Sequence, residues 1–383
     1  MNFLHRERAE LEAFMPGLDR ALAACPLAEL ERTPSPAIAA FREAGGPGLL
    51  VPAAYSGAGA TALQAVRVQR AVGARCPSLA VATTMHHFSV AGLVAAAAYG
   101  AEPGAECGGG LEGVLLERVA KERLLVASAF AEGRPGQNIL TPHLTAERRG
   151  DRIVLNGSKK PCSLSRSMDL LTASVALPGP DGVERLAVAL IPADTPGVTV
   201  HPFWGSPILA GAESDEVRLT DVELDPSMVV PTEVTADAVP DALNVAGFLW
   251  FELLLTAGYL GAASALVERA LRRPGGEADP TPYLVPVEGA VLAVEAVARA
   301  MADEPWDEAL LVRALTARYA AQDAIAATTR ACLEALGGMS FVNSPDGSYL
   351  ASAATGLAFH PPARARMARP LREHLDGRPL RIG

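Results

Sequence analysis

The sequence predicts an α+β protein in which a helical N-terminal domain, a middle antiparallel β domain and a C-terminal helical bundle follow one another. Apolar residues recur three and four positions apart near both ends of the chain, which is the period of an amphipathic helix. From about residue 122, short β-branched or alternating runs take over, and Gly and Pro separate them as in antiparallel strands. We therefore expect domains at residues 1–121, 122–235 and 236–383.

Each domain contains several expected elements. Residues 4–22, 34–45, 60–74 and 79–98 have helical periodicity and are separated by Gly and Pro. Strands are expected in the runs 123–130, 152–160, 170–177, 185–193, 198–203 and 216–224, which turn residues punctuate. Helices resume from about residue 241 and are expected at 243–271, 286–302, 308–336 and 363–374, with a linker at 272–282.

Composition excludes several classes of protein. Half of the 383 residues are hydrophobic and 20% are charged, which suits a large packed core. The net charge of −10 argues against a nucleic-acid partner, because phosphate contacts need clustered Lys and Arg. The five Cys form no CxxC pair, and the His, Cys and acidic residues show no metal-ligand spacing, so we expect no metal. The cysteine pattern and an N-terminus unlike a signal peptide favour a cytoplasmic location.

Two apolar stretches raise the alternative of a membrane protein. The mean hydropathy is +0.21. Residues 79–99 and 245–267 are each long enough to cross a bilayer, and Glu252 is the only charge in the second. A carboxylate near the centre of a span costs roughly 2.5–3.5 kcal/mol, and both stretches are rich in Ala and Gly. We therefore expect buried core helices and no membrane partner.

Four short motifs occur in a characteristic order. They are VPAAYSGAG at 51–59, AFAEGRPGQN at 129–138, GDRIVLNGSK at 150–159 and a late Gly pair at 337–338. This series resembles the acyl-CoA dehydrogenase superfamily, whose signatures include VPxxYGGxG, TEPxxGSD, DxxxLNGxK and a late GG turn. The resemblance spans essentially the whole chain and implies the acyl-CoA dehydrogenase-like fold, with the same α–β–α order.

The resemblance also implies an FAD cofactor. In the superfamily FAD lies between the β domain and the C-terminal helices, often completed by a neighbouring subunit. The loop at 131–138 would present backbone N–H groups to the flavin, and Ser163 would place its hydroxyl near flavin N5. The implied cofactor-binding residues are Ala131, Gly136, Gln137, Asn138, Ser163, Gly337 and Gly338. The superfamily's RxxxFG motif has no match at 272–282, which leaves open a member that has lost FAD.

The expected catalytic base departs from the family pattern. Most members carry a Glu in a YEGT motif near the C-terminus, and here that position falls on His360, followed by two prolines. A second family position for the base falls on Phe251, one residue before Glu252. Because one helical residue turns a side chain by about 100°, two interpretations of Glu252 stay open. It is either the base or a buried structural carboxylate.

His360 suggests a second chemistry. A flavin monooxygenase branch of the superfamily also lacks the Glu. It resembles this chain in a His of the N-terminal domain (compare His86 or His87), in Cys162-Ser163 and in a late His-x-Pro. A His suits proton transfer at neutral pH because its ordinary pKa is near 6.5. The candidate catalytic residues are therefore His360, Glu252 and His87.

Three functions follow from the resemblance. The first is α,β-dehydrogenation of an acyl thioester by an FAD-dependent oxidoreductase. The alternatives are a flavin-dependent monooxygenase that uses His in place of Glu, and a non-catalytic member without FAD. The expected partners are an acyl-CoA thioester, an acyl-carrier-protein thioester or a related small molecule. The resemblance also implies a homodimer or homotetramer.

Overall fold

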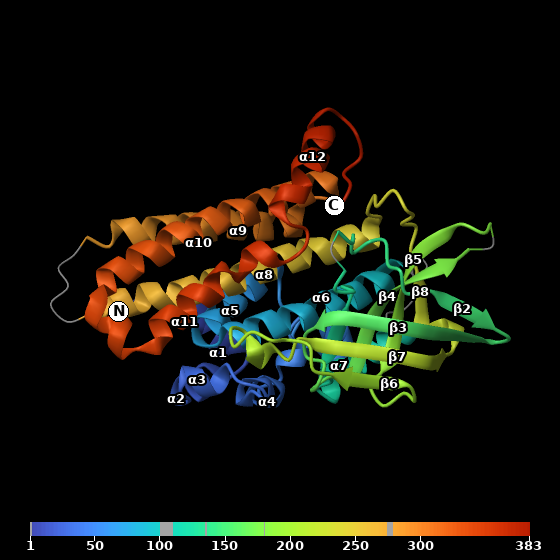
Figure 1. The fold of residues 1–383 in the computed structure, drawn as a ribbon, viewed down its shortest axis with the longest axis horizontal. Coiled ribbons are helices and arrows are strands. Elements are labelled where there is room, and N and C mark those ends of the chain that lie inside the picture. Colours follow the sequence, from blue (N-terminus) through green and yellow to red (C-terminus); the bar gives the residue numbers. More distant parts are fainter. Residues whose placement is uncertain (1, 100–109, 135, 180, 274–278) are drawn as a thin grey trace.

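The computed structural model describes residues 2–99, 110–134, 136–179, 181–273 and 279–383 (Figure 1). The N-terminal domain contains α1 (His5–Phe14), α2 (Leu18–Ala24), α3 (Leu27–Leu30), α4 (Pro36–Glu43), α5 (Ala62–Arg75), α6 (Pro77–Tyr99) and α7 (Leu111–Lys121). The C-terminal bundle contains α8 (Ala242–Leu271), α9 (Thr281–Asp303), α10 (Glu308–Asn343), α11 (Pro345–Ala354) and α12 (Arg364–Leu375). The predicted order of helices, strands and helices is confirmed.

The middle domain consists of two sheets. Its strands are β1 (Val126–Ala129), β2 (Ala146–Arg149), β3 (Arg152–Cys162), β4 (Leu170–Pro178), β5 (Glu184–Pro192), β6 (Val198–His201), β7 (Asp215–Leu224) and β8 (Val229–Pro231). One sheet has the order β1-β4-β5-β8 and the other β2-β3-β7-β6. The strand pairs are antiparallel as expected, except that β1 runs parallel to β4. A parallel pair needs a long connection, and β2 and β3 supply it here.

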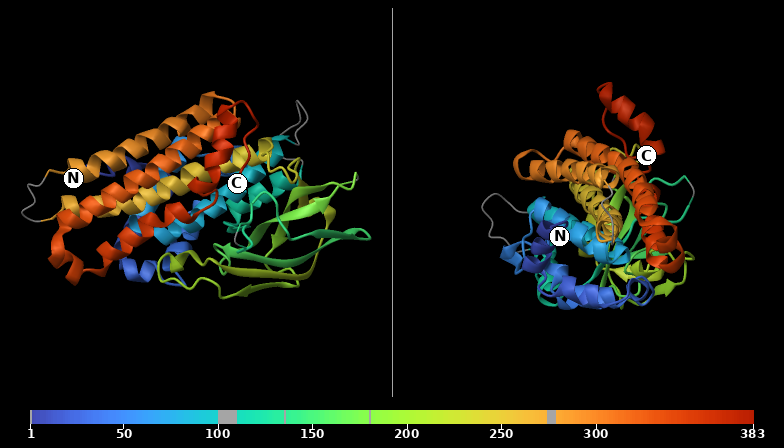
Figure 2. Two further views of the ribbon diagram at one scale, coloured as in Figure 1. Left: turned by 45° about the horizontal axis from the view of Figure 1, so that its top comes forward. Right: turned by 90° about the vertical axis from the view of Figure 1, so that its left-hand side faces the viewer.

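Helix α8 forms the centre of the molecule. It contacts α5 and α6 of the N-terminal domain and α9, α10 and α11 of the bundle. In the end-on view of Figure 2, the orange helices lie on one side of α8 and the blue N-terminal helices on the other. A Cβ on Gly73 of α5 would lie 2.1 Å from the carbonyl oxygen of Gly258 of α8, so only Gly permits this close helix crossing.

The two apolar stretches of the sequence fall in α6 and α8. Among the described residues, these are the helices long and apolar enough to cross a membrane by length and composition. The apolar window of α8 is 94% buried inside the protein and that of α6 is 67% buried. Buried core helices pass the same test of length and composition. The two most apolar stretches of the sequence thus form helices of the protein interior.

Two helices of the bundle differ from their expected bounds. Helix α9 begins at Thr281, before the expected start at residue 286, so Pro286 lies inside the helix. Helix α10 extends past the Gly pair to Asn343, but Gly337 has φ +77° and interrupts its helical geometry. Helix α11 was not expected from the sequence.

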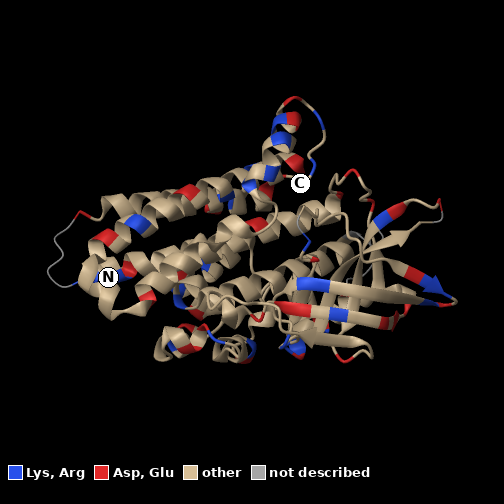
Figure 3. Cartoon of the chain, viewed as in Figure 1, with Lys and Arg blue, Asp and Glu red and all other residues tan. Residues whose placement is uncertain are grey.

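Figure 3 shows acidic and basic residues interspersed over both helical parts and the β domain.

Candidate active site

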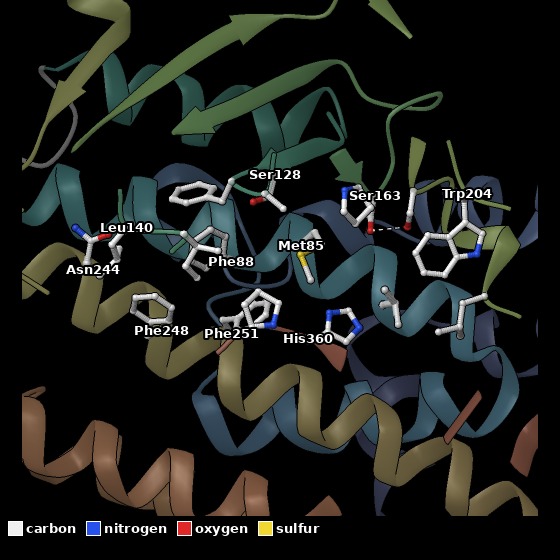
Figure 4. A pocket seen from close by; sticks show the side chains of 18 residues that line it. Met85, Phe88, Ser128, Leu140, Ser163, Trp204, Asn244, Phe248, Phe251 and His360 are labelled. Carbon is white, nitrogen blue, oxygen red and sulfur yellow. Dashed lines mark hydrogen bonds between the residues drawn. The ribbon is translucent and has the colours of Figure 1, made fainter. Parts of the chain in front are cut away.

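A pocket lies where the β domain meets α6 and α8 (Figure 4). Helix α6 contributes Val81, Met85 and Phe88, and α8 contributes Asn244, Phe248 and Phe251. Both sets follow the spacing i, i+4, i+7, so each helix turns one face toward the pocket. The other lining residues come from the β domain and from loops, and they are Ser128, Phe130, Ala131, Ile139, Leu140, Pro161, Ser163, Trp204, Leu209, Ser214, His360 and Pro361.

The β domain contributes the hydroxyl groups of Ser128, Ser163 and Ser214 to the pocket, beside larger side chains such as Phe130 and Trp204. Ser163 is 7% exposed, and its Oγ lies 2.9 Å from Oγ of Ser214. One hydroxyl donates to the other, so the pair keeps one O–H for a bound molecule. Trp204 lies beyond this pair at one end of the pocket, and Asn244 lies at the opposite end (Figure 4).

A buried ion pair holds the loop that carries Ala131. Nζ of Lys159 lies 2.9 Å from Oε1 of Glu132, and both side chains are almost fully buried. The same carboxylate accepts hydrogen bonds from the backbone N–H groups of His143 and Leu144. Burial lowers the pKa of Lys159 to about 8, although Glu132 acts in the opposite direction. The two motifs at 129–138 and 150–159 are therefore joined by one salt bridge.

His360 lines the pocket and makes a hydrogen bond to α8. Its Nε2 lies 2.6 Å from Oη of Tyr259. Burial lowers the pKa of His360 to about 3, and the charge of Arg318 acts in the same direction. Burial also raises the pKa of Tyr259. Both groups are therefore neutral at pH 7.

Arg318 fixes the segment that carries His360. Its guanidinium donates hydrogen bonds to the carbonyl oxygens of His360, Pro361 and Leu357 at 2.5, 3.2 and 3.3 Å. It also pairs with Oε2 of Glu252 at 2.7 Å, and both side chains are fully buried. Burial raises the pKa of Glu252, whereas Arg318 opposes this shift.

Phe251, at the second family position for the base, and its neighbour Glu252 face different surroundings. Phe251 lines the pocket, whereas Glu252 lies outside the lining and binds Arg318. This is the outcome of the rotation of about 100° between neighbouring helical residues. The geometry favours the structural interpretation of Glu252, through its contact with the guanidinium that holds His360.

The histidines of the N-terminal domain lie outside the pocket lining. His86 bonds the carbonyl oxygen of Pro47 through Nε2 and accepts from the backbone N–H of Val126 through Nδ1, both at 3.0 Å. His87 is buried and packs edge-on against Phe41, and within the described part of the chain neither of its ring nitrogens has a hydrogen-bond partner. Burial lowers the pKa of His87 well below its usual range.

The predicted cofactor residues fall into three groups. Ala131 and Ser163 line the pocket. Gln137 and Asn138, on the same loop, face the C-terminal segment: Arg366 donates to the carbonyl oxygen of Gln137, and Asn138 donates to that of Ile382. Gly136 has φ +83°, with Nη2 of Arg366 as the neighbour nearest to a Cβ placed there. Gly337 and Gly338 lie on α10, outside the pocket lining.

Sequence reasoning missed Tyr259, Arg318 and the aromatic residues on the helical side of the pocket. Phe88 packs edge-on against Phe130 and Phe251, with ring centroids 5.1 and 5.9 Å apart. The available signal was the spacing of Asn244, Phe248 and Phe251 on one face of α8. That signal is weak, because almost every residue of α8 is buried and no polar face marks the opposite side.

Fold and pocket together define the class of this protein. The family model described as "Acyl-CoA dehydrogenase, N-terminal domain" matches residues 20–102. The chain is also 48% identical over 383 residues to isobutylamine N-hydroxylase from Streptomyces viridifaciens, with 100% of both chains covered. The chain therefore belongs to the acyl-CoA dehydrogenase superfamily, within which it is a relative of that N-hydroxylase, and it is an oxidoreductase of this fold.

Solved structures share the fold at lower identity. FMN-bound TdsC from Paenibacillus sp. A11-2 is 20% identical, with a TM-score of 0.78 and coverage of 100% of this chain and 99% of that chain. The prolyl acyl carrier protein oxidase AnaB is 18% identical, with a TM-score of 0.80 and coverage of 97% and 98%. These likenesses extend over the three domains together.

Proposed function

We propose that this protein is a flavin-dependent monooxygenase that hydroxylates the nitrogen of a small aliphatic primary amine. The observation that carries this proposal is the chemistry of the pocket. Among the described residues, its lining contains a neutral His360 and neither a carboxylate nor a Lys or Arg side chain. A relative that is 48% identical over its whole length is named isobutylamine N-hydroxylase, which supports the choice of substrate.

The residues of the pocket fit a flavin. A planar, largely apolar ring with polar edges suits a largely apolar cavity whose lining includes aromatic side chains and a few hydroxyl groups. Ala131 and Pro161 line the β-domain side of the pocket, and the Ser163–Ser214 pair would offer a hydroxyl to a polar edge of the ring. The superfamily resemblance implies FAD, whereas TdsC is named with FMN. Release of the flavin from purified protein, followed by chromatography, distinguishes the two.

A bound, reduced flavin supplies the pair of electrons with which dioxygen reacts with an amine. A nicotinamide-dependent flavin reductase would provide that reduced flavin. One oxygen atom enters an N–H bond of the amine and forms a hydroxylamine, and the other leaves as water. The reaction needs the neutral amine, because an ammonium ion has no free electron pair. An apolar pocket without a carboxylate disfavours the ammonium form and so selects the reactive one.

We assign to His360 the role of hydrogen-bond donor to the oxygen atom that leaves as water. Among the described residues, it is the only side-chain hydrogen-bond partner of Tyr259 Oη. A buried hydroxyl is satisfied when it donates, so Tyr259 donates to Nε2 and the ring proton stays on Nδ1. Nδ1–H can then donate to the oxygen that leaves as water. A ring whose pKa is about 3 is a weak base, which disfavours proton abstraction from an acyl thioester.

The test of this proposal is formation of a hydroxylamine. Purified protein is incubated in air with isobutylamine, FMN, a flavin reductase and NADH, and the products are measured by mass spectrometry. We expect isobutylhydroxylamine with wild-type protein, and a loss of at least about a hundredfold in its rate for His360→Phe. Flavin turnover without any oxygenated amine would contradict the proposal.

A second candidate function is α,β-dehydrogenation of an acyl thioester. The superfamily membership favours it, and the oxidase AnaB is named for an acyl carrier protein substrate. Anaerobic bleaching of the bound flavin by an acyl-CoA or acyl-carrier-protein panel would support this function over N-hydroxylation. A colourless protein that takes up no flavin would support the non-catalytic alternative.

We also propose that the protein is a cytoplasmic homodimer or homotetramer. Next to the Gly pair on α10, the apolar side chains of Met339, Phe341 and Val342 are 72%, 65% and 76% exposed. Such a cluster is typical of a surface that another chain covers. Light scattering during size-exclusion chromatography measures the oligomeric state, and a monomer at micromolar concentration would contradict the proposal.

A further inference from the structure

Three lining residues of the pocket come from one loop of the β domain. Residues 202–214, the wall loop, connect β6 to β7. The wall loop contributes Trp204, Leu209 and Ser214 to the pocket. Figure 4 shows Trp204 toward the same end of the pocket as His360. The wall loop therefore forms part of the enclosure at the end where the imidazole lies.

The wall loop has an unfavourable backbone conformation. Its regular structure is one 3-10 turn, η3 (Ala210–Ala212). Leu209 and Glu213, on either side of this turn, have φ of +61° and +55°. Residues with a side chain rarely adopt this left-handed region, because it costs free energy. The conformation of the wall loop therefore depends on contacts with other elements.

Tyr349 of α11 supplies one of these contacts at the pocket lining itself. Its Oη accepts the backbone N–H of Leu209 at 2.9 Å and donates to Oε2 of Glu31. Glu31 is 3% exposed, and its carboxylate also accepts from the backbone N–H and the hydroxyl of Ser78 at the start of α6. Burial raises the pKa of Tyr349, so its hydroxyl keeps the proton that it donates. One hydroxyl thus ties a lining residue of the pocket to a buried carboxylate of the N-terminal domain.

Two more contacts hold the wall loop against the same part of the N-terminal domain. The backbone N–H of Gly211 donates to the carbonyl oxygen of Glu31 at 2.9 Å, and Oγ1 of Thr33 donates to that of Ala210. A Cβ on Gly211 would lie 2.7 Å from the carbonyl oxygen of Leu30, so this close approach requires Gly. These contacts fix η3, whereas Tyr349 holds the lining residue that precedes it.

We propose that Tyr349 is a positioning residue that keeps the wall loop closed over the amine, so that electrons reach the amine reaction instead of being lost to dioxygen alone. This inference rests on the proposed N-hydroxylation. When no amine is held beside His360, dioxygen takes up two electrons from reduced flavin and two protons and leaves as hydrogen peroxide. An enclosed site that orients the amine and excludes water limits this side reaction.

The test measures coupling, which is the amount of isobutylhydroxylamine formed per dioxygen consumed, in wild-type protein, Tyr349→Phe and Tyr283→Phe. Tyr283 is a buried tyrosine of α9 outside the pocket lining, so its variant is the matched control. We expect Tyr349→Phe to lower coupling by about fivefold, because one hydrogen bond contributes about that factor to an equilibrium. Hydrogen peroxide should rise to balance the dioxygen consumed, with flavin content unchanged. Tyr283→Phe should keep the wild-type coupling.

The fluorescence of Trp204 provides a measurement that does not depend on the reaction. The sequence contains three Trp, and Trp250 and Trp306 pack edge-on against each other. Both are replaced by Phe, so that Trp204 remains. Trp204 is 38% exposed, and its Nε1–H donates to the carbonyl oxygen of Ile208 within the wall loop at 2.9 Å. We expect Tyr349→Phe to increase the quenching of this fluorescence by acrylamide, because the loop loses a contact.

Coupling and quenching equal to wild type in Tyr349→Phe would overturn the inference, and so would a lower melting temperature with unchanged coupling. If Tyr349→Phe does not fold, Thr33→Val replaces it with the same expectation, because it removes the contact to Ala210 in the same loop. Increased quenching of Trp204, without hydroxylation of any amine by wild-type protein, would refute N-hydroxylation and retain Tyr349 as the residue that holds the wall loop. Hydroxylation by wild-type protein, with coupling and quenching unchanged in Tyr349→Phe, would do the reverse.

Discussion

Three backbone carbonyl oxygens around His360 accept hydrogen bonds from one guanidinium, that of Arg318. Glu252 neutralises this guanidinium from α8, and Tyr259, two turns further along α8, bonds the imidazole directly. The ring of His360 is therefore held by one hydrogen bond to its side chain, and the surrounding segment by three hydrogen bonds to backbone carbonyl oxygens. The groups that orient His360 are thus distinct from the imidazole that faces the pocket.

Tyr259→Phe tests the role of the hydroxyl. The variant keeps the aromatic ring but removes the hydrogen-bond donor to Nε2 of His360. The tautomer with the proton on Nδ1 is then no longer favoured over the other tautomer. We expect kcat for isobutylamine to fall by about tenfold or more, with KM and flavin content close to wild type. Steady-state kinetics and the absorbance of bound flavin measure these quantities. A loss of flavin together with activity would show that Tyr259 only supports the fold.

Glu252→Gln separates the two interpretations of this carboxylate. The variant leaves Arg318 with an uncompensated buried charge, which typically costs about 3–5 kcal/mol of the free energy of unfolding. We therefore expect a large loss of stability in urea unfolding, accompanied by partial activity in the fraction that remains folded. A variant that is as stable as wild type but inactive would identify Glu252 as a catalytic base.

His87→Leu tests a pH dependence at the residue scale. The folded-state pKa of His87 lies below its unfolded value of about 6.5 because of burial, so the unfolded state binds more protons as the pH falls. This His therefore destabilises the fold progressively as the pH falls below about 6.5. Thermal unfolding at both acidic and neutral pH should show a smaller acid-induced loss in the variant. Equal losses in both proteins would contradict this reading, and lost N-hydroxylation would support the predicted catalytic role of His87.

At the scale of elements, the pocket is an assembly of one face of α6, one face of α8 and one loop of the β domain. The sequence motifs predicted that loop, and Ala131 and Ser163 do line the pocket. They did not predict which face of α8 contributes, because a helix buried on all sides shows no polar contrast. The parallel pairing of β1 with β4 was missed for a similar reason, since pairing direction depends on a partner far along the chain.

Lys159→Met tests whether the Glu132–Lys159 pair holds the cofactor loop. Loss of Nζ leaves Glu132 buried without its charged partner, and the loop that carries Ala131 loses its anchor. We expect flavin to bind at least about tenfold more weakly, as quenching of flavin fluorescence measures. Lys160→Met is the matched control, because the neighbouring Lys160 pairs with Glu216 at 3.0 Å and is 28% exposed. Equal effects of the two substitutions would contradict the proposed anchor.

At the scale of the whole molecule, the order of domains could be predicted because helical and strand periodicities differ and four motifs occur in family order. Membership in the acyl-CoA dehydrogenase superfamily is confirmed by the family model and by a full-length relative. The reaction could not be predicted in the same way. The resemblance places His360 where most of the family has a Glu, but only the surroundings of this side chain, Tyr259 and Arg318, indicate what it can do.

In the proposed reaction, oxygen is transferred to the nitrogen of an amine in the pocket that His360 lines. To test this transfer, the protein is incubated with isobutylamine, reduced flavin and isotopically labelled dioxygen. Mass spectrometry then determines the mass of the product. We expect isobutylhydroxylamine that carries one labelled oxygen atom, and no such product from His360→Phe. An unlabelled or absent hydroxylamine, with anaerobic oxidation of an acyl thioester by the same protein, would contradict it.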